Sequence, residues 1–184
     1  MRAGQANGSE VRKVCLFANV HRALQFAFEV AATREAIKTP SYDEPTAGGT
    51  GEKVARNDLV GQAAFVMQAT RQALTPDLLA HVTCTHDGAG EARRAALATL
   101  CAEHAHIHKN AGLLRACWGR EYEFGETWCE SLPAIAIANG CGQTTAETVA
   151  RKVRRATVEL ERYATQALHA AFVAKGWIPH YSRG

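Results

Sequence analysis

An apolar stripe near the end of the chain is the feature that most constrains the fold. Its residues recur at alternating spacings of four and three: Val149, Val153, Ala156, Leu160, Tyr163, Ala167 and Ala170. This spacing places them on one side of an α-helix, a pattern typical of a helix that packs along another helix or along a second copy of itself. We predict one helix from Thr144–Thr145 to about Lys175, ended by Gly176. The stripe leaves open whether the helix packs within the chain or forms a homodimer.

The composition of the whole chain also favours helices. The 184 residues include five prolines and few runs of β-branched residues, and no hydrophobic alternation demands a sheet. Hydrophobic residues make up 47% and charged residues 21%, which excludes a disordered chain and permits a core without disulfides or metal. No apolar run approaches the roughly 18 residues of a membrane span. The six cysteines show no repeated CxxC. We therefore expect a soluble, cytoplasmic protein with reduced thiols.

Capping residues and turns divide the chain into successive helices. The first apolar segment runs from Val11 to about Lys38, and polar residues within it argue against a signal peptide. Further helices are predicted over residues 57–74, 76–83, 91–108, 110–119 and 127–139. The spacing within the helix over 57–74 predicts an inward stripe of Leu59, Ala63, Val66, Met67 and Thr70.

These elements group into four parts. They are an N-terminal helix (1–38), a flexible linker (39–54), a helical core (55–125) and a C-terminal part (126–184). The predicted fold is an all-α multi-helix domain that ends in a helix-turn-helix, whose second helix continues into the long C-terminal helix.

Residues 131–175 have the layout of a helix-turn-helix. Ala136 provides a small residue where a second helix can cross closely, and Gly140 supplies the chain reversal. Thr145 is predicted as the N-cap of the second helix, with Val149 and Val153 facing the core. The turn between Gly140 and Thr145 is about three residues longer than the tightest form of this motif.

Positive charge gathers in the same region. Residues 1–92 carry nine Lys and Arg against ten acidic residues, whereas residues 93–184 carry twelve against eight. Short polar side chains at a helix start suit base edges, and Lys or Arg one turn later suit phosphates. The predicted DNA-facing residues are Thr144, Thr145, Thr148, Arg151, Lys152, Arg154 and Arg155. The alternative is an amphipathic helix whose Lys and Arg form a solvated surface.

The order of these features resembles a known family. Ser131-Leu132, then Ile135-Ala136 and Gly140, a short turn and a basic helix together resemble the C-terminal segment of phage Q-type antitermination proteins. The segment is also similar to region 4 of sigma factors, and the resemblance covers about residues 110–175. It implies a phage or prophage regulator that binds DNA near a late promoter, loads onto paused RNA polymerase and suppresses termination. By the same resemblance, six of the seven DNA-facing residues above (all but Arg154) would contact DNA.

A second unusual feature is a cluster of histidines and cysteines. On a helix over 91–108, Cys101, His104 and His108 would share one side, with Cys84 and His86 one loop away. Sulfur and nitrogen ligands of this kind suit tetrahedral Zn²⁺, and some Q-type proteins carry zinc in a loop insertion. The alternative is a polar helix end whose histidines lie near the C-terminal dipole.

Enzyme motifs are missing from the sequence. It has no Rossmann, P-loop, GxSxG or HExxH pattern, so we expect no enzymatic activity. The leading hypothesis is a DNA-binding transcription regulator of phage type that recognises double-stranded DNA and acts as an antiterminator with RNA polymerase. The alternative is a helical protein-interaction scaffold, with or without zinc, that has no nucleic-acid role.

Overall fold

The structure, a computed structural model, describes residues 15–36, 50–87, 90–123 and 131–180. Within these residues the chain forms seven α-helices, one short 3-10 turn and no strand, which confirms the predicted all-α class. The helices are α1 (Val20–Ala36), α2 (Thr50–Ala73), α3 (Pro76–His86), α4 (Glu91–Glu103), α5 (Ala111–Glu121), α6 (Leu132–Ala138) and α7 (Gln143–Ala174), with the 3-10 turn η1 (Ala105–Ile107) after α4.

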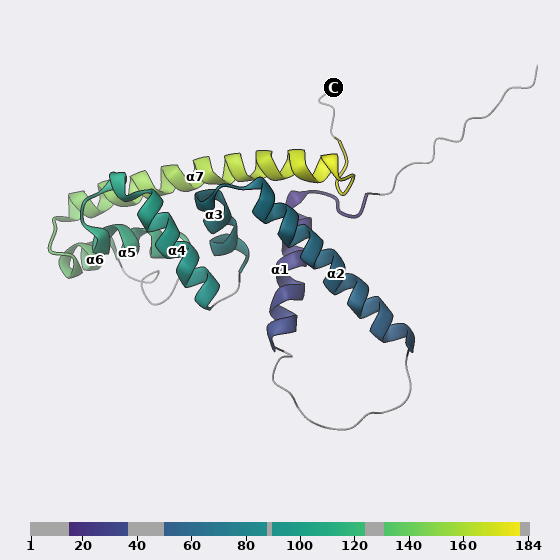
Figure 1. Cartoon of the computed structure of the whole chain (residues 1–184). Helices are drawn as coiled ribbons and strands as arrows, with labels where there is room; N and C mark the ends of the chain where they lie inside the picture. Colours follow the sequence, from purple (N-terminus) through teal and green to yellow (C-terminus); the bar gives the residue numbers. More distant parts are fainter. Residues whose placement is uncertain (1–14, 37–49, 88–89, 124–130, 181–184) are drawn as a thin grey trace, which may run out of the picture.

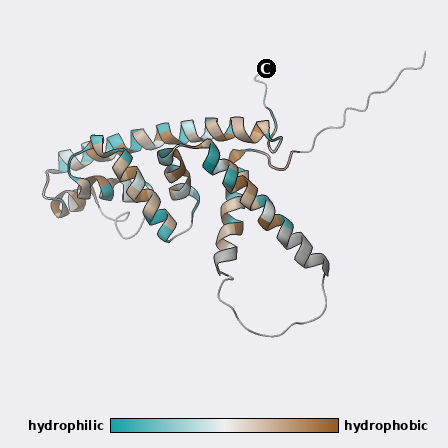
Figure 2. Ribbon diagram, in the orientation of Figure 1, coloured by the Kyte–Doolittle hydropathy of each residue, from teal (hydrophilic) through white to brown (hydrophobic). Residues whose placement is uncertain are grey.

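The long helix α7 runs along one side of the molecule and contacts most of the other helices (Figure 1). Its 32 residues extend about 48 Å at 1.5 Å per residue. The helices α3, α5 and α6 pack along it, α4 covers α3 and α5, and α1 and α2 meet its C-terminal part. Hydrophilic and hydrophobic residues alternate along α7, as expected for a helix with one buried side (Figure 2).

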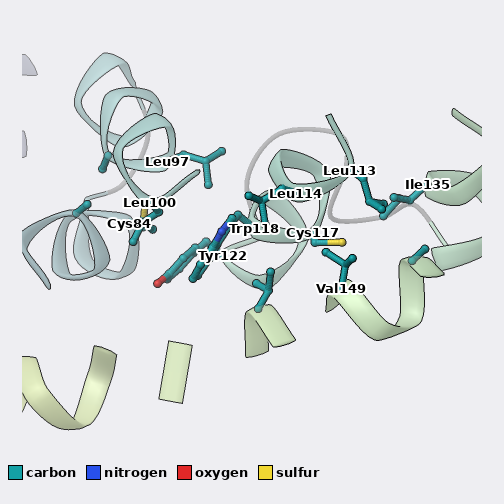
Figure 3. Close-up of a cluster of buried hydrophobic side chains, with 14 of the residues drawn as sticks. Cys84, Leu97, Leu100, Leu113, Leu114, Cys117, Trp118, Tyr122, Ile135 and Val149 are labelled. Atoms are coloured by element: carbon teal, nitrogen blue, oxygen red, sulfur yellow. The ribbon is translucent and has the colours of Figure 1, made fainter. Parts of the chain in front are cut away.

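Two hydrophobic clusters lie side by side along α7. In the first, Leu113 and Trp118 of α5 pack with Ile135 of α6 and Val149 of α7, all almost fully buried (Figure 3). In the second, Leu168 and Phe172 of α7 pack among residues of α1, α2 and α3. Burial of each large side chain contributes roughly 1.5–3 kcal/mol. Because α7 contributes to both clusters, it fixes the two halves of the fold to each other.

The buried stripe of α7 agrees with the sequence prediction only over its first half. The buried residues of this helix are Ala146, Val149, Val153, Leu160, Ala164, Leu168 and Phe172. Beyond Leu160 the predicted stripe is wrong at Tyr163, which is 50% exposed, and at Ala170, which is also exposed, whereas Ala167 is partly buried against the second cluster. After Leu160 the buried residues follow a spacing of four, as α7 passes from one cluster to the other. The predicted end of the helix is confirmed, since Gly176 adopts a φ of 69° just after it.

The N-terminal elements begin at different residues from those predicted. Cys15–Asn19 are not helical, and α1 begins at Val20 because the Asn19 side chain accepts the backbone N–H of Arg22 at 3.0 Å. Residues 11–14 and 37–49 lie outside the described residues, with most of the predicted linker. Its last residues, 50–54, belong to α2. The prediction that Leu59 points inward is wrong, since it is 47% exposed and burial among the described side chains of α2 begins only at Ala63.

The helix predicted over residues 91–108 is shorter in the structure. It ends at Glu103, and the η1 turn follows directly after His104. The chain then re-enters a helix at Asn110, whose side chain accepts the backbone N–H of Leu113 at 3.0 Å. His108 has an extended backbone, so Cys101, His104 and His108 do not share one helix side as predicted.

A tight connection joins α6 to α7. Ser131 caps α6 and Pro133 lies in its first turn, while residues 127–130 of the predicted helix lie outside the described part. Gly140 has a φ of 60°, and the N–H of Cys141 donates to the carbonyl of Ala136 at 2.9 Å. The cap of α7 is Gly142, so the prediction of Thr145 as N-cap is wrong. Since α7 begins two residues before Thr145, the connection is shorter than predicted.

Candidate functional site

The N-terminal half of α7 presents a row of polar side chains to solvent. Its members follow spacings of four, three and four: Thr144, Thr148, Arg151 and Arg155. All four are exposed, whereas Ala146, Val149 and Val153 on the opposite side are at most 2% exposed. The packing of α5 and α6 against the buried side therefore fixes which residues of α7 face outward.

The four predicted cations lie together on this exposed surface. Arg151, Lys152, Arg154 and Arg155 are all exposed, and none forms a salt bridge with another described residue. Arg151 and Arg155 continue the outward row, and Lys152 and Arg154 lie on its two flanks, as the helical periodicity requires. We call Thr144, Thr148, Arg151, Lys152, Arg154 and Arg155 the basic surface. Its unpaired positive charge suits an anionic partner.

The threonines of the predicted site differ in their environment. Thr145 is half-buried, so it belongs less to the exposed row than Thr144 and Thr148. The Thr148 hydroxyl donates to the carbonyl of Thr144 at 2.8 Å. This bond uses the hydroxyl proton and leaves the oxygen free to accept a hydrogen bond from a partner.

Sequence reasoning missed a further cation on the same row. Arg162 lies seven residues after Arg155, is exposed, and places its guanidinium 4.6 Å from the ring centroid of Tyr163. The helical spacing alone was sufficient to find it. It was not among the predicted residues because it lies outside the cluster of Lys and Arg over residues 151–155.

The residues predicted to bind zinc do not converge in the structure. Cys84 is buried near Cys101, whereas His86 packs against His21 and Phe28, with ring centroids 5.2 and 5.7 Å away. His104 packs on Trp118, and Nδ1 of His108 accepts the backbone N–H of Asn110 at 3.0 Å. In the described part of the chain, no three His, Cys, Asp or Glu side chains are arranged to hold a metal ion.

Sequence reasoning also offered no prediction for His81, a buried histidine with two hydrogen-bond partners. His81 is 2% exposed, and its two ring nitrogens lie 2.6 Å from the Tyr122 hydroxyl and 2.7 Å from Glu161 Oε2. The three residues come from α3, the end of α5 and α7. They are 41 and 80 residues apart in the chain, so local spacing gave no signal. His81 and Glu161 also line a cavity of about 240 Å³, together with His21, His86 and His169.

A larger groove runs beside the basic surface. It has a volume of about 610 Å³ and lies between the start of α3, the η1 turn and α7. Lys152 and Arg155 belong both to this groove and to the basic surface. Tyr163, His104 and Leu160 line other parts of it. The structure thus brings aromatic, apolar and charged side chains together in one groove that shares two cations with the basic surface.

No known protein family, characterised protein or solved structure matches this chain. None of the helices in the described residues is both long enough and apolar enough to cross a membrane.

Proposed function

We propose that this protein is a transcription regulator that binds double-stranded DNA through the basic surface of α7. The observation that carries the proposal is the exposed row from Thr144 to Arg155, on the side of α7 opposite its buried residues. Two threonines at the start of the helix are short enough to let the backbone approach base edges. In this proposal, the arginines one and two turns later neutralise phosphates.

The connection before α7 supports this mode of binding. A short helix, a connection over residues 139–142 and a longer second helix together match the order of elements in a helix-turn-helix. In such a motif the N-terminal part of the second helix enters the major groove. That part of α7 carries the basic surface on one side and is held by the first hydrophobic cluster on the other, while the second cluster holds its C-terminal part.

The resemblance to Q-type antitermination proteins adds a second partner to the proposal. If it holds, the regulator would act with RNA polymerase as a phage-type antiterminator. A homodimer remains a prediction, and it needs a surface other than the apolar stripe, whose buried residues pack within the chain.

A salt titration of binding to mixed genomic duplex DNA tests the proposal. Each phosphate contact contributes about 0.9 to the slope of log K against log salt. The double variant Arg151→Ala/Arg155→Ala should bind more weakly and lose roughly 1.8 from the slope. A matched control is Arg71→Ala/Arg94→Ala, which removes two exposed arginines from α2 and α4 and should leave the slope unchanged.

Each result has a defined meaning, provided that thermal unfolding shows both variants folded. An unchanged slope in the Arg151/Arg155 variant would refute the assignment of the basic surface. No binding by the unmodified protein at about 50 mM salt, where phosphate contacts are strong, would favour the protein-interaction scaffold. If the unmodified protein does bind DNA, selection of enriched fragments from the bound DNA would identify the recognised element.

A further inference from the structure

The groove beside the basic surface combines two kinds of chemistry along α7. Lys152 and Arg155 lie on adjacent turns at one end, where two cations can hold one phosphate. Tyr163 lies eight residues beyond Arg155, roughly 12 Å along the helix axis, and its ring is half exposed. The buried Leu160 forms an apolar floor between the two ends.

Carboxylates in the groove narrow the class of ligand. Asp77 and Glu159 line it together with Lys152 and Arg155, so its charges nearly balance. A simple inorganic anion would be attracted by the cations and repelled by the carboxylates. A ligand that carries both a phosphate and N–H donors would pair with both kinds of charge, because carboxylates accept hydrogen bonds from amino groups of bases.

His104 supplies a third observation. It lines the groove, and its Nε2 atom is buried without a hydrogen-bond partner among the described residues. Burial lowers the pKa of His104 more than the nearby Asp77 raises it. The ring is therefore neutral near pH 7, and a buried neutral nitrogen gains stability when a ligand atom pairs with it.

We propose that this groove binds a nucleoside phosphate whose base carries an amino group. The phosphate contacts Lys152 and Arg155, the base stacks on Tyr163, and the carboxylates accept the amino protons. The groove volume of about 610 Å³ lies within the roughly 300–1,000 Å³ of small-molecule sites. Because Lys152 and Arg155 also belong to the basic surface, the nucleotide competes with DNA. This last consequence rests on the proposed function, whereas nucleotide binding itself does not.

Calorimetric titration of the full chain with AMP, and separately with inorganic phosphate, tests the binding site. AMP should bind with one site per chain and more tightly than inorganic phosphate. Tyr163→Ala should weaken AMP binding about tenfold through lost stacking, whereas Tyr163→Phe should retain most of the affinity. Lys152→Ala should weaken AMP binding by a similar factor. No AMP binding at millimolar concentration, or equal affinity in the unmodified protein and Tyr163→Ala, would overturn the proposal.

A competition experiment separates this proposal from the proposed function. AMP should displace DNA from the unmodified protein, and Tyr163→Ala should bind DNA normally but resist displacement. If AMP binds as expected and the protein does not bind DNA, the groove assignment stands and the DNA-binding function fails. If the protein binds DNA but not AMP, the DNA-binding function stands and the groove assignment fails.

Discussion

His81 Nε2 lies 2.7 Å from Glu161 Oε2, in a contact that joins α3 to α7. A carboxylate only accepts hydrogen bonds, so Nε2 carries a proton and donates it. In the neutral ring, Nδ1 then accepts the Tyr122 hydroxyl at 2.6 Å. The two bonds satisfy a histidine that is almost fully buried. The side chain of Glu161 is 63% exposed, so the pair holds the helices in register more than it adds electrostatic energy.

The first prediction concerns the hydroxyl of Tyr122. Tyr122→Phe removes the partner of His81 Nδ1 in a buried site, which should lower the free energy of unfolding by about 1–3 kcal/mol. Tyr163→Phe is a matched control because it removes the same group from a half-exposed ring, and it should change stability by less than about 0.5 kcal/mol. Urea titration measures both. Equal stability of the two variants would contradict the role given to the buried hydroxyl.

The second prediction is that stability falls as the pH is lowered below about 6.5, the ordinary pKa of histidine. Burial lowers the pKa of His86, and the charge of His21 lowers it further. Burial also lowers the pKa of His104. The unfolded chain then binds these protons at a higher pH than the folded chain, so protonation favours unfolding.

Protonation of Glu161 also favours unfolding, but at a lower pH than that of the histidines. Partial burial works to raise the pKa of Glu161, but the hydrogen bond from His81, together with weaker contributions from its neighbours, outweighs burial and lowers the pKa. Its contribution is present above the pKa of the unfolded glutamate and is lost as the pH falls through the folded pKa. Urea titrations at a series of pH values measure the slope. His86→Phe should flatten the decline around pH 6, and an unchanged profile in that variant would show that His86 does not cause it.

Local signals predicted many of the element ends correctly. Thr75-Pro76 starts α3, Asn110 caps α5, and Gly140 and Gly176 follow the ends of α6 and α7. Each of these signals is short-range. Pro76 occupies the first turn of α3, where a backbone N–H has no helical partner, Asn110 accepts a backbone N–H of α5, and the two glycines adopt a positive φ. A few neighbouring residues are enough to produce such a signal, so the sequence alone predicts where these helices begin or end.

Features that depend on long-range packing were not predictable in the same way. The buried side of α7 includes Ala164 in place of the predicted Tyr163, because different helices cover the two halves of α7. The contacts of His81 join residues far apart in the chain. For the candidate site, the spacing identified the exposed cations. The groove that shares Lys152 and Arg155 depends on where η1 and α3 pack.

A third prediction tests the chain reversal at Gly140. Its φ of 60° is unfavourable for residues with a Cβ, although an added Cβ would meet no atom within 4 Å. Gly140→Ala should therefore destabilise the protein by about 1 kcal/mol through backbone strain alone. Gly61→Ala, in the interior of α2 and equally free of close atoms, should stabilise it by up to about 1 kcal/mol. Thermal unfolding of the two variants should shift in opposite directions, and shifts of the same sign would contradict this explanation.

A fourth prediction concerns the cysteines. Burial raises the pKa of Cys84 and of Cys117 to about 11. At pH 8 only about one in a thousand of these thiols is the reactive thiolate, and both side chains are shielded. Among the five cysteines that the structure describes, iodoacetamide should label the half-buried Cys15 and Cys141 first in the native protein, as peptide mass spectrometry would show. Labelling of Cys84 as fast as Cys15 would mean that α3 opens locally.

The last prediction separates two ways in which α7 could meet DNA. If its N-terminal part enters the major groove, the contribution of a cation should fall with distance along the helix. Arg162 lies eleven residues beyond Arg151, roughly 16 Å further along the axis, and its guanidinium packs over Tyr163. Arg162→Ala should therefore reduce the salt slope of DNA binding much less than Arg151→Ala, which should remove about 0.9. Equal losses in a fluorescence anisotropy titration would mean instead that α7 lies along the phosphate backbone over most of its length.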